Sequence, residues 1–189
     1  FRQLAENIKE VFWLTDVGQE EMLYISPAYE EIWGQSCESL YARPASWMDA
    51  VHPEDREQAR LAASKQVTGT YHEEYRIIRP DGTIRWIRDR AFPICDETGT
   101  VYRIAGIAEC ITAQKIAEQR MAAQYAVTQV LAEASSLDEA SPRILEAIGR
   151  GLGWDVAAIW SVDELGNVLR CVDLWHCDVV DAAAFDRSS

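Results

Sequence analysis

Hydrophobic and polar residues alternate with a period of two in three consecutive segments near the middle of the chain, at about residues 70–79, 83–94 and 100–111. This period predicts β-strands that each bury one face. The short connections at 79–82 and 96–99 contain Asp and Gly in turn-forming order. The three strands are therefore expected to form successive antiparallel hairpins.

The preceding residues predict a second hairpin followed by helices. Compact apolar runs at 11–16 and 22–26 flank a turn, and both are rich in aromatic and branched side chains. Helical spacing is found at 1–10, short helical turns at 38–51, and a longer helix from Pro53 to about Val67. In that helix, Glu54 and Asp55 would complement the positive end of the helix dipole. This order predicts an α+β fold, with one five-stranded antiparallel sheet and helices on one of its faces.

A polar helix is expected directly after the last strand, over residues 112–134. Apolar positions recur at spacings of four and three, which is a heptad-like seam formed by Ile116, Arg120, Ala123, Val127, Val130 and Ala134. The seam is short, its apolar residues are small, and Arg120 interrupts it. Two interpretations remain open: a parallel coiled-coil homodimer through this connecting helix, or an amphipathic helix packed on its own domain.

The C-terminal part predicts one helix and one hairpin. The helix runs from Pro142 to about Leu152, and the strands cover 156–162 and 168–175. Because an isolated hairpin is marginal in water, this part looks like the beginning of a second, incomplete domain. The predicted division is a first domain at 1–112, a connecting helix at 113–133 and the start of another domain at 134–189.

Composition excludes some classes of partner. The 189 residues carry a net charge of −13, which argues against nucleic acid and against anionic membrane surfaces. No apolar run approaches the roughly 20 residues that span a bilayer, and no signal peptide is seen, so we expect a cytoplasmic location. Because the chain does not begin with Met, we expect it to be part of a longer protein.

The cysteines give no sign of a metal or redox site. The chain has five, without any C-x-x-C spacing: Cys37, Cys95, Cys110, Cys171 and Cys177. They are expected to be free thiols, mostly buried, as in a reducing compartment.

Residues 1–112 resemble a PAS domain with its PAC motif. The resemblance rests on several short matches in order: Asn7-Ile8, Phe12 to Asp16, Tyr24 to Tyr29, Trp33-Gly34, His52 to Asp55, Tyr75 to Ile77, Arg79 to Gly82, Trp86 and Gly106 to Glu109. The family usually ends in Asp-Ile-Thr, whereas this chain has Cys110-Ile111-Thr112. This departure removes a carboxylate that can brace the junction between strand and helix in the family.

Residues from about 126 to 189 resemble the start of a GAF domain. The matches are Ile144 to Ala147 on a helix, Gly153 to Asp155 before a strand, and Leu169 to Val172 before Trp175-His176. Together, the two resemblances imply the input half of a bacterial signalling protein. An output module is then expected further along the same chain, most often a histidine kinase of a two-component system and sometimes a cyclic dinucleotide enzyme.

PAS folds can enclose a pocket between sheet and helices, and six aromatic residues are candidates for its wall: Trp13, Tyr24, Trp33, Tyr75, Trp86 and Phe92. The alternative is that these residues simply fill the core. No cofactor is predicted, although a small-molecule ligand is compatible with the fold. The reactive Cys of flavin-binding relatives is absent, and residues 54–67 lack the His of haem-binding relatives. His52 is interpreted as a residue at the start of a helix.

The leading hypothesis is a non-catalytic sensory and dimerisation module that passes a conformational bias from the sheet to the helix. The residues expected to carry this relay are Gly106, Glu109, Cys110, Ile111, Thr112, Ile116 and Arg120. The second hypothesis is a receptor for a small organic molecule or cofactor. The third is a small enzyme, which is disfavoured because no phosphate-loop, nucleophile-elbow or zinc-protease motif occurs and no metal site is predicted.

Overall fold

The computed structural model describes residues 9–18, 21–69, 71–163, 166, 168–178 and 180. The chain divides into two compact units, Phe1–Ala113 and Gln114–Ser189. The helix expected at 1–10 lies almost entirely outside the described residues. Of this range only residues 9 and 10 are described, and they form a bend.

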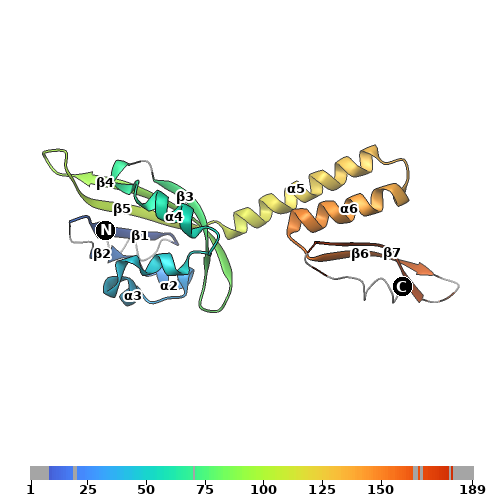
Figure 1. Cartoon of the computed structure of the whole chain (residues 1–189), viewed down its shortest axis with the longest axis horizontal. Coiled ribbons are helices and arrows are strands. Elements are labelled where there is room, and N and C mark those ends of the chain that lie inside the picture. Colours follow the sequence, from blue (N-terminus) through green and yellow to red (C-terminus); the bar gives the residue numbers. More distant parts are fainter. Residues whose placement is uncertain are drawn as a thin grey trace. The chain divides into compact units, whose positions relative to one another are not determined.

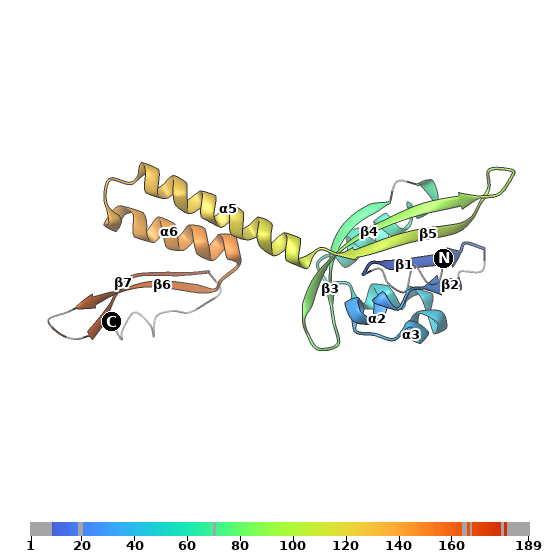
Figure 2. The same ribbon diagram turned by 180° about the vertical axis from the view of Figure 1, so that it is seen from behind.

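The first unit contains the predicted five-stranded antiparallel sheet. Its strands are β1 (Val11–Asp16), β2 (Glu21–Ile25), β3 (His72–Ile78), β4 (Ile84–Cys95) and β5 (Val101–Cys110). Their order across the sheet is β2-β1-β5-β4-β3, so the β1–β2 hairpin and the three consecutive strands β3 to β5 join through β1 and β5 (Figure 1). Figure 2 shows the same sheet from behind. The predicted α+β fold is therefore confirmed.

The two predicted turns close the long hairpins. Gly82 and Gly99 have φ angles of 82° and 84°, a left-handed conformation that glycine adopts without steric cost. In each turn an Asp side chain accepts a backbone hydrogen bond two residues on: Asp81 from Thr83 at 2.9 Å, and Asp96 from Thr98 at 2.8 Å.

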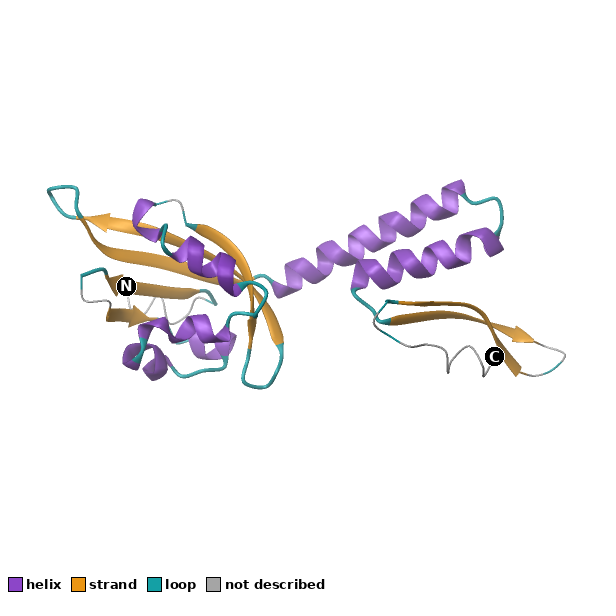
Figure 3. Ribbon diagram, in the orientation of Figure 1, coloured by secondary structure: helices purple, strands orange, loops and turns teal. Residues whose placement is uncertain are grey.

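Short helices lie on one face of the sheet (Figure 3). They are α2 (Ala28–Trp33), α3 (Cys37–Ala42), the 3₁₀ helix η1 (Pro44–Ala50), α4 (Arg56–Ala63) and the 3₁₀ helix η2 (Gln66–Thr68). The main core forms between this layer and the sheet, where Tyr29, Leu40, Ile77 and Ile87 are at most 2% exposed.

The helix predicted from Pro53 to Val67 is shorter than expected. Residues 53–55 form turns, α4 ends at Ala63, and η2 is a separate turn. The backbone before α4 is bound to β3 instead, because His52 N–H donates to the carbonyl of Arg76 at 2.8 Å and the Asp55 carboxylate accepts from Arg76 N–H at 2.8 Å. These two bonds hold residues 52–55 out of the helix.

The second unit contains most of α5 (Thr112–Glu133), followed by α6 (Leu137–Leu152) and the antiparallel pair β6 (Val156–Asp163) and β7 (Val168–His176). A helix and a hairpin are present at the predicted positions, and most of the helix belongs to this second unit. However, α6 begins five residues before Pro142, which lies inside the helix. Ser136 caps this earlier start, since its hydroxyl accepts the backbone N–H of Glu139 at 3.2 Å.

Within the second unit, α5 and α6 pack closely. A Cβ at Gly151 of α6 would lie 3.1 Å from the Cβ of Ala123 on α5. Ala123 and Val130, two of the expected seam positions, are buried, whereas Ile116 and Arg120 are exposed. Part of the predicted seam is therefore buried within the second unit and is not available to a partner.

Among the described helices, none combines the length and the apolar character that a bilayer crossing requires. All five cysteines are free thiols, but none is fully buried, and Cys95 is exposed. The expectation that they are mostly buried was wrong.

Candidate functional site

A cavity of about 570 Å³ lies inside the first unit, between the inner face of the sheet and the helices. Aliphatic side chains of both layers contribute to it, among them Val11, Ile25, Leu40, Ile104 and Ala108. A volume of this size falls in the range of small-molecule sites.

Three of the six aromatic residues predicted for a pocket wall do line this cavity: Trp13, Trp33 and Tyr75. The other three, Tyr24, Trp86 and Phe92, are not among the residues that line it. On β4, the buried positions are Ile87, Asp89 and Ala91. Because side chains alternate along a strand, Trp86 and Phe92 belong to the outer face of the sheet, where Phe92 is 50% exposed.

Trp47 of η1 and Tyr29 of α2 complete the aromatic lining, and sequence reasoning did not select either residue for it. The ring centroids of Trp47 and Tyr75 lie 5.8 Å apart, and those of Tyr29 and Trp33 lie 5.0 Å apart in a stacked arrangement. The indole N–H of Trp33 is buried without a hydrogen-bond partner among the described residues. The cavity therefore has an unused donor in one of its lining residues.

Asp89 is the acidic residue buried at this cavity, with 5% exposure. Its Oδ1 accepts the indole N–H of Trp13 at 3.2 Å, and its Oδ2 accepts the hydroxyls of Tyr71 at 3.2 Å and Tyr75 at 3.1 Å. Sequence reasoning missed this residue. The available signal was a carboxylate on the face of an alternating strand that otherwise carries apolar side chains.

Burial dominates the ionisation of this group. Removal from water raises the pKa of Asp89 from 3.8 to about 6, although the bonds from Trp13, Tyr75 and Tyr71 each favour the charged form. Burial and the nearby carboxylate of Asp89 also raise the pKa of Tyr71 and Tyr75 well above their usual value, so both hydroxyls remain donors.

Gly106 of β5 makes room for one wall of the site. It pairs with Trp13 of β1, and a Cβ on Gly106 would lie 2.1 Å from the indole ring. Only a glycine allows the ring to lie over β5 at this point. Gly106, which was expected to belong to the relay, therefore also positions Trp13 at the cavity.

The other expected relay residues fall into two groups. Glu109, Cys110, Ile111 and Thr112 lie where β5 passes into α5. There, the N–H of Ile111 donates to the carbonyl of Trp86 at 2.9 Å, and the N–H of Trp86 donates to the Thr112 hydroxyl at 2.8 Å. Ile116 and Arg120 are exposed further along α5.

Side chains support the same junction. Glu109 lies 3.6 Å from Arg88 of β4, which also pairs with Glu74 of β3 at 2.9 Å. The sulfur of Cys110 and the hydroxyl of Thr112 are 3.4 Å apart. Thr112 therefore ties the start of α5 to β4, while Arg88 links β4 to β3 and to the end of β5.

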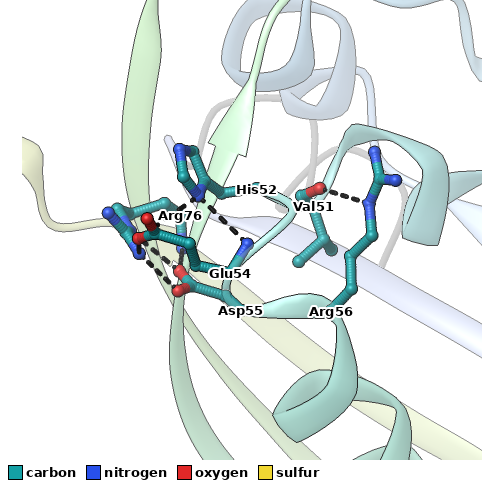
Figure 4. A network of polar contacts seen from close by, with 6 residues as sticks. All are labelled: Val51, His52, Glu54, Asp55, Arg56 and Arg76. Carbon is teal, nitrogen blue, oxygen red and sulfur yellow. Dashed lines mark hydrogen bonds and ion pairs between the residues drawn. The ribbon is translucent and has the colours of Figure 1, made fainter.

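A second polar cluster joins the beginning of α4 to β3 (Figure 4). His52, Glu54 and Asp55 bring potential metal-ligand atoms within 4.8 Å of one another. Arg76 already occupies this cluster, with ion pairs of 2.6 Å to Asp55 and 2.8 Å to Glu54. The hydrogen bonds from Arg76 hold the pKa of Asp55 below its usual range. The two carboxylates therefore bind Arg76 of β3, and Asp55 also directly precedes the first residue of α4.

The comparisons with known proteins agree with this geometry. Residues 22–108 match the family described as "PAS fold". The structure of the N-terminal domain of a diguanylate cyclase with PAS/PAC sensor from Marinobacter aquaeolei is 25% identical, with a TM-score of 0.51, and the match covers 56% of this chain and 97% of that one. A sensory box histidine kinase/response regulator from Burkholderia thailandensis is 26% identical with a TM-score of 0.50, covering 63% and 90%.

Among curated proteins, the methyl sulfide methyltransferase-associated sensor of Methanosarcina acetivorans is 28% identical over 119 residues, which is 61% of this chain. The matches span only 12% and 15% of the lengths of the two curated relatives found. The similarity therefore concerns a small part of much longer proteins.

Proposed function

Because the first unit is a PAS sensor domain of the kind found in signalling proteins, we propose that this chain is the input region of a sensor histidine kinase. It relays a conformational change from its sheet into α5. Its own role is then sensory and non-catalytic. It works in the cytoplasm as part of a longer protein that belongs to a two-component system.

The observation that carries the proposal is the hydrogen-bonded junction between β4 and the start of α5. Trp86 binds Ile111 and Thr112 through its backbone carbonyl and N–H. A change in the position of β4 therefore acts directly on the first residue of α5. A bias of a few kcal/mol is enough to redistribute two states of such an element.

The test is a helix break just beyond the junction, at the exposed Ala117. Ala117→Pro removes a backbone hydrogen bond and costs about 3 kcal/mol of helix stability. In the full-length parent protein, we expect the output activity to lose its response to the stimulus, while the near-UV circular dichroism of the first unit is retained. Ala117→Ser is the matched control. Regulation that persists in the proline variant would refute the relay.

The similarity to a diguanylate cyclase sensor supports a second candidate function, a small-molecule or cofactor receptor that feeds a cyclic dinucleotide enzyme. The specific observation in its favour is the cavity of about 570 Å³, which has an unsatisfied indole donor in its lining. The two functions are compatible, since a ligand in the cavity contacts the strands that lead to the junction.

We further propose that residues 134–189 are the start of a GAF domain. The hairpin exposes large apolar side chains, including Trp160, Val162 and Leu169 at 43%, 69% and 63%. Such exposure is typical of a sheet whose remaining strands and covering elements are absent. We also propose that the chain forms a homodimer through α5.

A further inference from the structure

We propose that the cavity of the first unit binds a small methylated ammonium cation, held among its aromatic side chains next to the carboxylate of Asp89. This inference rests on the receptor function proposed above and specifies the chemistry of its ligand. It follows from three properties of the cavity: a buried negative group, the saturation of that group with hydrogen bonds, and the aromatic lining.

The first property is charge without a counter-ion. Asp89 is bound by Trp13, Tyr71 and Tyr75, all of which are neutral, and no described residue forms an ion pair with it. A buried carboxylate without a cation is costly to ionise. A cationic ligand in the adjoining cavity would supply the missing charge.

The second property distinguishes between kinds of cation. An ionised carboxylate offers about four lone-pair sites. Three side-chain donors already use Asp89, and a backbone hydrogen bond from Arg90 also favours its charged form. A primary amine would have to compete with these donors for an acceptor. A quaternary ammonium group needs no acceptor and interacts through charge alone, so it suits a carboxylate whose hydrogen bonds are satisfied.

The third property is the lining. Five aromatic residues contribute to the cavity: Trp13, Tyr29, Trp33, Trp47 and Tyr75. Aromatic rings attract a cation through their quadrupole, by about 0.5–2 kcal/mol depending on desolvation, and aromatic cages are a known way to hold quaternary ammonium groups. The unpartnered indole N–H of Trp33 provides a donor for a hydroxyl oxygen on the same ligand.

One positive residue also lines the cavity. Arg43 belongs to the loop between α3 and η1, and its guanidinium pairs with Asp49. The side chain of Arg43 is 69% exposed, so its charge is directed mainly to solvent and to Asp49. It does not neutralise the buried Asp89.

The experiment compares two probes of nearly equal shape by titration calorimetry on the 189-residue chain. Choline carries the quaternary nitrogen, and 3,3-dimethyl-1-butanol has a carbon in its place. We expect choline to bind at least about tenfold more tightly, which corresponds to about 1.4 kcal/mol. Asp89→Asn should abolish this preference. Glu97→Gln, which neutralises an exposed carboxylate in the β4–β5 turn, should leave it unchanged.

Equal affinity for the two probes would overturn the cation inference and leave the receptor function standing. Absence of binding by both probes at millimolar concentration would overturn it as well. If Asp89→Asn does not fold, as judged by near-UV circular dichroism, the probe ratio in the unmodified chain decides. Trp47→Leu then provides the second variant, with an expected loss of the choline preference. The relay is tested separately by the Ala117 variants.

Discussion

Asp89 is the residue at which burial and hydrogen bonding act most directly against each other. Three side-chain donors and the backbone N–H of Arg90 favour its charged form, yet its pKa lies above the usual value because the group is removed from water. Such a group binds a proton more readily in the folded protein than in the unfolded chain. Its effect on stability is therefore opposite to that of Asp55, whose pKa is lowered by Arg76.

A change of pH should reveal this difference. Asp89 stabilises the fold most below about pH 4, and this contribution is lost as the pH rises through about 6. The rise from 3.8 to about 6 corresponds to about 3 kcal/mol. Relative to Asp89→Asn, the free energy of unfolding of the unmodified chain should fall by about this amount between about pH 4 and about pH 7. Urea denaturation across this range measures it, and parallel curves for both proteins would contradict the assignment.

Single residues also show how far the sequence predicts the site. Trp13, Trp33 and Tyr75 were predicted from their aromatic character, which favours burial. Trp86 and Phe92 were misplaced, although the alternation that predicted β4 puts them on the same face as Arg88 and Arg90. The alternation of β4 does set Asp89 on an apolar face, but its role and that of Trp47 depend on donors and rings that are distant in sequence.

At the level of whole elements, strands and hairpins were predictable and helix ends were not. The strands carry period-two patterns and distinctive turns, so their number and the hairpins between neighbours follow from short-range signals. The pairing of β1 with β5, which completes the sheet, is a long-range contact that these signals do not give. The ends of α4 and α6 depend on particular hydrogen bonds. Arg76, 21 residues away, binds Asp55 before α4, and Ser136 begins α6 ahead of a proline that normally marks a first turn.

The cap of α6 gives a prediction at this scale. Ser136→Ala removes the acceptor for the Glu139 N–H and should cost about 1 kcal/mol of stability in the second unit. Ser135→Ala is the matched control, because only the backbone N–H of Ser135 contacts Glu139. Hydrogen exchange at the Glu139 amide measures the effect. Equal exchange rates in the two variants would mean that the hydroxyl of Ser136 does not cap the helix.

For the whole molecule, the proposed homodimer requires a face of α5 that α6 leaves uncovered. Ala123 and Val130 are buried inside the second unit, so the seam expected from the heptad pattern is not free along its length. Met121 and Tyr125 are 62% and 68% exposed, and they are four residues apart on the same helix face. This face is the better candidate for contact with a second copy.

Replacement of Tyr125 tests this face. Tyr125→Glu places a charge in the proposed contact and should shift the chain toward monomer by at least about tenfold in dissociation constant, measured by sedimentation equilibrium. Gln124→Glu adds the same charge at an adjacent exposed position and should have little effect. If both variants associate equally, the contact lies elsewhere.

The close fit of Trp13 over Gly106 has a consequence for protein engineering. The sheet side of the cavity cannot be enlarged or reshaped by substitution at position 106, because even a methyl group would displace the indole and with it a donor to Asp89. A biosensor for a different analyte would have to be built from the opposite wall. There, Trp33 and Trp47 lie on short helical segments that take no part in the pairing of β1 with β5.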